Sequence, residues 1–247
     1  MNNNASPIGL LAALLGSLAL AAGLAAGGWG IAQGLERFRL ADRSVSVKGL
    51  AERDVPSDYA IWPLGFRRGG TEFGAVQRAL AEDRDRVLAY LKQRGFSEAE
   101  IEVRPLQVQD LFAREYGGGN QPLRFQGTGL VLVKTDKTEA VAAAALAVDP
   151  LIQAGMQLGG ANDGPAGPRY QLRGFNEVKA PLLAEATRNA REQAQKFAAE
   201  AGATLGPLRS ANQGVIQIGG ADGQGYDDGS SRIKRLRVVS SFQYTLE

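Results

Sequence analysis

The strongest constraint on this chain is a run of 25 uncharged residues near its start, positions 7–31. These positions are mainly Ala, Leu and Gly, and the first charged residue of the whole chain is Glu36. A helix rises about 1.5 Å per residue, so the run reaches roughly 37 Å, enough to cross the apolar core of a bilayer. The sequence therefore predicts an N-terminal tail (1–6) followed by a transmembrane anchor (7–31).

A cleaved signal peptide is the alternative interpretation of this segment. Its apolar region normally spans about 7–15 residues behind a positively charged start. Here the apolar run is longer, and the first six residues carry no basic side chain. We therefore favour an uncleaved anchor, although small residues such as Ala19-Leu20-Ala21 leave cleavage open.

The orientation of the anchor is not decided by charge alone. Arg37, Arg39, Arg43 and Lys48 follow the apolar run, and the positive-inside rule keeps such residues in the cytoplasm. Long C-terminal domains, however, cross the membrane largely regardless of these charges. We favour export of the domain.

Small residues recur along one side of the predicted anchor. They alternate in steps of three and four: Gly9, Ala12, Gly16, Ala19, Gly23, Ala26 and Gly30. A seam of this kind lets two membrane helices approach closely and associate. Because 14 of the 25 residues are Gly, Ala or Ser, a chance pattern is the alternative.

The rest of the chain predicts an α+β domain at 44–247, behind a short polar stalk at 32–43. The first repeat, 44–135, has the patterns of strands near 44–48 and 59–67, a helix at 72–94, and strands at 101–114 and 123–135 joined by a loop at 116–120. Pro63 cannot donate a ladder hydrogen bond, so we expect an edge position or a bulge there.

A second repeat of the same βαββ type is predicted at 151–247. An Ala-rich helix (137–148) leads to strands at 151–158 and 169–174, a helix at 177–201, and closing strands at 205–218 and 235–246. Pro181 is expected in the first turn of the long helix. Its inward positions are predicted to be Leu183, Ala186, Ala190, Ala194, Phe197 and Ala201. In the last strand, Leu236, Val238, Phe242, Tyr244 and Leu246 share the face predicted to be buried.

Composition excludes several kinds of chemistry. The chain has no Cys and no His, which removes Ser-His-Asp and Cys-His nucleophilic sites, thiol redox chemistry and the usual zinc sites. A net charge of +2 argues against nucleic acid as the main partner. The Gly-rich stretch 219–229 carries three carboxylates, but their spacing fits neither an EF-hand loop nor a full Asp-containing nonapeptide repeat, so we favour a solvated hairpin tip over a metal site. No cofactor is predicted.

Two groups of residues are candidates for an interface. Lys234, Arg235 and Arg237 form a basic cluster, as do Arg67 and Arg68. Such clusters can meet acidic lipid or a partner's carboxylates, but the charged outer face of a strand is the commoner explanation. In the other group, Asn212 and Gln213 stand beside Gly214. Gly214 suggests a bulge or a close backbone approach, and the two amides either bridge to another strand or subunit or face water.

Several motifs in one order resemble the SIMPL-domain family. They include Val45-Ser46-Val47-Lys48-Gly49-Leu50-Ala51-Glu52-Arg53, Ala60-Ile61-Trp62-Pro63-Leu64, Asn176-Glu177-Val178-Lys179, Leu183-Ala184-Glu185-Ala186-Thr187-Arg188-Asn189-Ala190-Arg191, Arg209-Ser210-Ala211-Asn212-Gln213-Gly214 and Lys234-Arg235-Leu236-Arg237-Val238-Val239. The resemblance implies a duplicated βαββ fold, a bacterial envelope location and, in some members, a link to oxidative-stress defence or assembly into rings with a central channel. It implies no catalytic residues.

Together these features predict a non-enzymatic protein of the inner membrane, crossing it once with its domain in the periplasm. We expect lipid and further copies of the chain as partners, and no nucleic acid. The alternative is a protein that binds a small ligand or lipid in a cleft between the two repeats.

Overall fold

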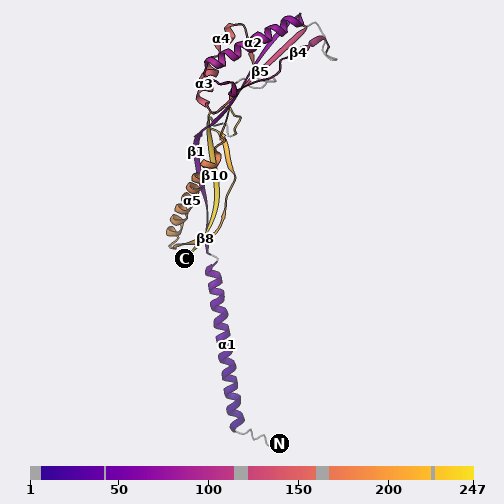
Figure 1. Cartoon of the computed structure of the whole chain (residues 1–247). Helices are drawn as coiled ribbons and strands as arrows, with labels where there is room; N and C mark the ends of the chain where they lie inside the picture. Colours follow the sequence, from indigo (N-terminus) through magenta and orange to yellow (C-terminus); the bar gives the residue numbers. More distant parts are fainter. Residues whose placement is uncertain (1–6, 42, 114–121, 160–166, 224–225) are drawn as a thin grey trace. The chain divides into compact units, whose positions relative to one another are not determined.

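A computed structural model of the chain describes residues 7–41, 43–113, 122–159, 167–223 and 226–247. It shows a mixed α+β protein with two antiparallel sheets behind one N-terminal helix (Figure 1). The predicted tail 1–6 and the predicted hairpin loop 116–120 lie outside the described residues.

The N-terminal helix α1 runs from Pro7–Ala41, so the predicted stalk continues the same helix through Ala41. Within it, Leu15–Gly34 is long and apolar enough to cross a membrane, with a mean hydropathy of 1.5. None of this window is buried inside the protein. By length and composition, the segment therefore suits a membrane anchor or a signal sequence.

The chain divides into two compact units, the first of which includes the N-terminal helix. The first comprises Met1–Leu50, Ala186–Gly214 and Val239–Glu247, and the second comprises Ala51–Glu185 and Val215–Val238. Three elements contribute residues to both: β1 (Ser44–Pro56), α5 (Phe175–Glu200) and β10 (Ile233–Leu246).

The second unit is built on a long hairpin-like pair of strands. β2 (Tyr59–Gly70) pairs with β5 (Phe125–Thr135) in an unbroken register. The far edge of β5 carries β3 (Ile101–Val103) and β4 (Gln107–Asp110). The predicted strand at 101–114 is therefore two short strands, because Pro105 interrupts the ladder between them.

The other edge of β2 is covered only in part. β7 (Arg169–Gln171) pairs with residues 59–61, and β6 (Gln157–Gly159) pairs with residues 65–67. Pro63 lies in the stretch between them, where β2 has no strand partner on this side among the described residues. β2 is thus an inner strand of the sheet, and the predicted edge position holds only locally, for the described residues beside Pro63. The pairing with β5 contains no bulge.

Three helices cover one face of this sheet (Figure 1). α2 (Phe73–Gln93) ends before Gly95, whose φ of 86° needs the left-handed region that Gly adopts freely. α3 (Thr138–Leu146) agrees with the prediction, but α4 (Asp149–Gln153) replaces the first half of the strand predicted at 151–158. Pro150 suits the first turn of α4, which explains the helix. The core includes Trp62, Leu64, Phe66, Leu80, Leu91, Val131, Val133 and Tyr170.

In the first unit, α5 packs on a sheet ordered β1, β10, β8 (Leu205–Asn212). Ala190 and Ala194 are fully buried against Val47, Phe242 and Tyr244. Small helix residues permit this close packing, as the sequence predicted.

Details of α5 differ from the prediction. Its buried positions are Leu182, Ala186, Ala190, Ala194 and Ala198, four residues apart throughout. Phe197, which is 58 % exposed, was therefore assigned to the wrong face. Leu183 is half-buried, and Ala201 is exposed and lies beyond the end of α5. Because the helix already begins at Phe175, Pro181 lies in its interior and not in its first turn.

The closing strands follow the prediction more closely. In β10, Leu236, Val238, Phe242 and Tyr244 are buried and alternate with exposed or half-buried residues. The strand predicted at 205–218 is divided into β8 and β9 (Ile216–Gly220). Near the break, a Cβ on Gly214 would stand 2.0 Å from the Val239 carbonyl oxygen, so the predicted close backbone approach is confirmed.

The strand pairing mixes the two predicted repeats. β7, which precedes α5, pairs with β2 of the first repeat. β1, which opens the first repeat, lies next to β10 at the end of the second. Each sheet therefore contains strands from both halves of the sequence.

The contact between β1 and α5 generates a prediction. A Cβ on Gly49 would lie 1.9 Å from the Ala186 carbonyl oxygen and 2.9 Å from the Ala190 Cβ. Since backbone cannot move aside, we expect Gly49→Ala to lower the free energy of unfolding by about 2 kcal/mol or more, measured by urea unfolding of the purified protein. Gly74→Ala is the matched control, because its Cβ would meet nothing nearer than 3.6 Å. Equal urea midpoints for the two variants would contradict this packing.

Candidate functional site

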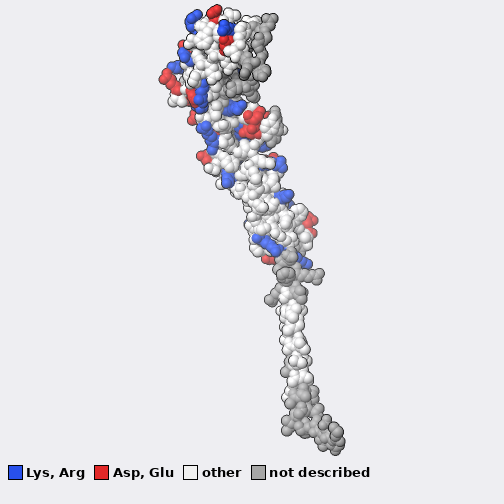
Figure 2. Space-filling model, turned by 90° about the vertical axis from the view of Figure 1, so that its right-hand side faces the viewer, with Lys and Arg blue, Asp and Glu red and all other residues white. Residues whose placement is uncertain are grey.

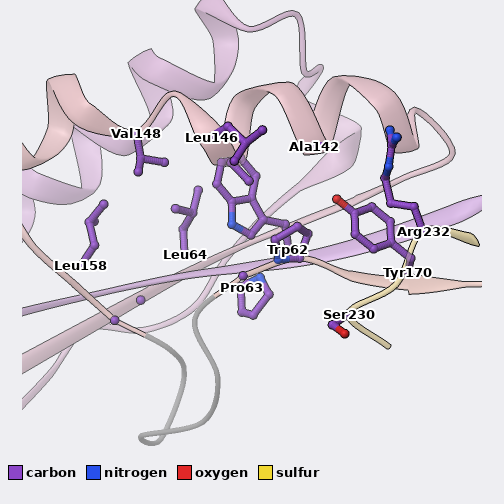
Figure 3. A pocket seen from close by; sticks show the side chains of 15 residues that line it. Trp62, Pro63, Leu64, Ala142, Leu146, Val148, Leu158, Tyr170, Ser230 and Arg232 are labelled. Carbon is purple, nitrogen blue, oxygen red and sulfur yellow. The ribbon is translucent and has the colours of Figure 1, made fainter. Parts of the chain in front are cut away.

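A pocket of about 530 Å³ opens on the part of β2 that lacks a strand partner (Figure 3). Trp62, Pro63 and Leu64 of β2 line it from one side, and α3 lines it from another through residues such as Ala142 and Leu146. Among the described residues no strand pairs with β2 beside Pro63, and there the pocket lies between side chains of the sheet and of the helix. Trp62 belongs to the core, with 3 % of its surface exposed, and it also borders this pocket.

One end of the pocket is polar. Tyr170 of β7, Ser230 and Arg232 line this end (Figure 3). The Tyr170 backbone N–H donates to the Gly229 carbonyl at 2.7 Å, which joins β7 to the segment before β10. The Arg232 guanidinium donates to Glu139 of α3. The pocket therefore has an apolar body and one end with a positive charge.

Two donors in the pocket have no partner. Tyr170 and Trp62 are 4 % and 3 % exposed, yet neither the phenol nor the indole N–H makes a hydrogen bond among the described residues. Among the described residues, Ser57 Oγ is the side-chain polar atom that is fully enclosed and has no hydrogen-bond partner; the Trp62 and Tyr170 donors are not fully enclosed. The Trp62 and Tyr170 groups therefore reach the open space of the pocket.

The protonation of Tyr170 follows from its surroundings. Burial raises the pKa of the phenol above its ordinary value, and the opposing effect of Arg232 is smaller. The hydroxyl is therefore a hydrogen-bond donor at neutral pH.

The predicted basic cluster at Arg67 and Arg68 is only partly a surface feature. Asp83 of α2 is fully buried, and Arg68 donates to its two oxygens at 2.5 and 2.7 Å. Arg86 adds a third hydrogen bond to Asp83 at 3.0 Å. The charged run 82–86 would suit an exposed helix face by its sequence, but Asp83 is buried and ties α2 to β2.

The predicted interface residues on β10 have partners within the second unit. Lys234 is fully buried and its Nζ lies 2.5 Å from Asp227 Oδ1, so it presents no charge to a partner molecule. Arg235 donates to both oxygens of Asp54 at 2.8 Å. These hydrogen bonds lower the pKa of Asp54 below its ordinary value.

The remaining interface candidates lie nearer the surface. Arg237 reaches Glu52 of β1 at 3.3 Å, a charged pair on neighbouring strands. Asn212 and Gln213 are exposed in the first unit, and Gly214 is half-buried. None of Asn212, Gln213 and Gly214 lines the pocket.

The Gly-rich stretch orders itself through its own carboxylates. Asp228 accepts hydrogen bonds from the N–H and Oγ of Ser230, and Asp227 accepts from Gly229 as well as Lys234. Across the described ranges, no three acidic residues gather in a way that suits a metal ion.

The most perturbed carboxylate is Glu100, before β3. Hydrogen bonds, above all from Thr135 and then from Ser97 and Lys137, lower its pKa to about 2, against a smaller opposing effect of burial. Its partners occupy both oxygens. We interpret the cluster as structural, since it closes the 3-10 turn at Glu98–Glu100.

A comparison with protein families finds one family whose model matches most of the chain. The model of the SIMPL family, described as a protein of unknown function (DUF541), matches residues 45–235. The chain belongs to the SIMPL family. A search of curated proteins found no match. The SIMPL description names no activity, so the function has to be argued from the molecule itself.

Sequence reasoning found only part of the pocket. Trp62 and Pro63 were singled out, and Pro63 signalled the unpaired stretch of β2. Tyr170 and Arg232 were missed as site residues, because they come from short segments more than one hundred positions away from β2. The pairing of β7 with β2 brings them there, and no local pattern predicts it.

The buried carboxylate on α2 generates a prediction. Asp83→Asn keeps the shape of the side chain but leaves the Arg68 charge without its counter-ion, and breaking a buried pair costs about 3–5 kcal/mol. We expect a loss of this order in the free energy of unfolding, measured by urea titration. Asp85→Asn is the control, because Asp85 is 64 % exposed and pairs with its neighbour Arg84. A urea midpoint for Asp83→Asn as high as that of Asp85→Asn would show that the pair does not stabilise the domain.

Proposed function

We propose that this SIMPL protein is a non-enzymatic, membrane-anchored envelope protein that assembles with copies of itself. The observation that carries the proposal is the exposed apolar helix. Over Leu15–Gly34 no part of the window is buried, and Trp29 is 70 % exposed. Figure 2 shows the described part of this helix as uncharged surface. An apolar surface of this length needs a cover, and lipid provides one.

The seam on α1 supports association of the anchors. All seven of its residues lie on the helix. A 3.5-residue repeat drifts only about 20° per heptad around a straight helix, so the seam stays on one side. A Cβ on Gly16, Gly23 or Gly30 would meet nothing within 4 Å, which leaves room for a second helix.

The edges of the β1–β10–β8 sheet support association of the domains. β1 and β8 are its outer strands, and each has one edge without a strand partner in the described part of the chain. On β8, Leu208 is 51 % exposed and the residues after it are exposed as well. Unpaired strand edges are templates for pairing with another chain.

The finer features of the proposal rest on the family resemblance. We place the protein in a bacterial inner membrane, with a SIMPL domain at 44–247 in the periplasm. We regard this domain as two βαββ repeats that exchange strands, and a ring with a central channel as one form of the oligomer. A role in oxidative-stress defence would not use thiol chemistry, since the sequence has no Cys.

Composition supports a role without catalysis and without nucleic acid. A chain lacking both Cys and His has few groups that exchange protons near neutral pH. A net charge of +2 offers little for binding phosphate backbones.

Self-assembly is tested by native mass measurement of the detergent-purified full chain and by a membrane dimerisation assay of α1. We expect an oligomer, and we expect Gly16→Leu and Gly23→Leu each to weaken helix association, because a Leu side chain on the seam keeps the two helix backbones from approaching closely. Gly28→Leu is the matched control, because position 28 lies on the opposite side of the helix from the seam. A strict monomer would contradict the proposed function, and equal effects of Gly16→Leu and Gly28→Leu would remove the seam from it.

A further inference from the structure

The pocket on β2 has the dimensions and surface of a small-molecule site. Its volume of about 530 Å³ falls within the range of roughly 300–1,000 Å³ typical of ligand pockets. Leu64, Leu146 and Leu158 supply much of the apolar surface (Figure 3). All lining residues belong to the second unit, so this site differs from the cleft between repeats considered on sequence grounds.

The side chains at the polar end offer donors. The protonated Tyr170 phenol donates, and Arg232 carries a full positive charge. The Ser230 hydroxyl is already used, since it donates to Asp228 at 2.6 Å. A ligand that matches this end must therefore bring acceptors, and a negative charge suits it best.

We propose that this pocket binds a monocarboxylate with an unbranched apolar tail, a free fatty acid of about ten carbons. Its carboxylate accepts hydrogen bonds from Tyr170 and Arg232, and its tail lies along Trp62 and the leucines (Figure 3). Glu139, the present partner of Arg232, is 85 % exposed and turns to water when the ligand's carboxylate takes its place.

The head group and the tail make separable contributions. Each methylene buried in the apolar part should raise the affinity about fourfold, until the pocket is filled. The carboxylate should add selectivity over a neutral head, because the nearly buried Tyr170 hydroxyl and the Arg232 guanidinium both gain a charged partner with it. A cationic head should bind worst, since it meets Arg232.

The test uses the full chain in lipid nanodiscs, because detergent would compete for an apolar pocket. The protein has two tryptophans, Trp29 and Trp62, so Trp29→Phe leaves Trp62 as the single fluorescent reporter inside the site. Decanoate, decanol and decyltrimethylammonium, which share a chain length, are titrated against Trp62 fluorescence. We expect saturable binding of decanoate at least tenfold tighter than of decanol, and the weakest response to the cation.

Variants distinguish binding in the pocket from partition of the probe into the surrounding lipid. Arg232→Gln should weaken decanoate at least tenfold and leave decanol unchanged, which also shows that the pocket is still folded. Arg235→Gln, an exposed arginine on β10 paired with Asp54, should change neither. Ala142→Phe, which fills the pocket, should abolish the response, whereas Ala143→Phe on the exposed side of α3 should not.

Two results would overturn the proposal. Equal affinity for decanoate and decanol would exclude recognition of a carboxylate, and a response that survives Ala142→Phe would place the ligand outside the pocket. Both results leave the oligomer and its anchor untouched, so they are distinct from a failure of the proposed function.

Discussion

The apolar surface of the N-terminal helix constrains this molecule more than any other feature, because water disfavours its exposure. A helix with 20 consecutive residues suited to a bilayer and none of that window buried in the protein must find its cover elsewhere. In the function we propose, lipid is that cover, and it confines every copy of the chain to one surface. Such confinement would raise the effective concentration of the domains, so that individually weak contacts along α1 and along strand edges would add up.

In the folded domain, the buried charged side chains form ion pairs with other side chains of the same unit. Asp83 is held by Arg68 and Arg86, and Lys234 by Asp227. Since a buried charge without a partner is costly, these pairs fix how α2 and β10 sit within the second unit. They also remove several of the charges that the sequence offers for binding. What remains in this unit is a pocket whose donors, on Trp62 and Tyr170, have no partner among the described residues.

Sequence patterns were informative where structure is local. The uncharged run marks α1, alternation marks β10, and the apolar spacing before Gly95 marks α2. The predictions were wrong where one sequence pattern fits two local structures about equally well. The apolar stretch after Pro150 fits a strand or a helical turn, and the difference between Phe197 and Ala198 on α5 is one step of 100° around the helix. The burial of Asp83 and Lys234 could not be predicted, because it depends on partners brought in by tertiary packing. The pocket was beyond local reasoning for the same reason: the pairing of β7 with β2 creates it.

The most direct test of the account is the intact mass of the protein recovered from membranes. If the apolar helix stays in lipid, the carbonate-washed membrane fraction contains the chain with residues 1–31 still attached, close to its full 26.1 kDa. A shorter product that has lost this helix and appears in the soluble fraction would contradict the account, since it would identify the segment as a cleaved signal sequence.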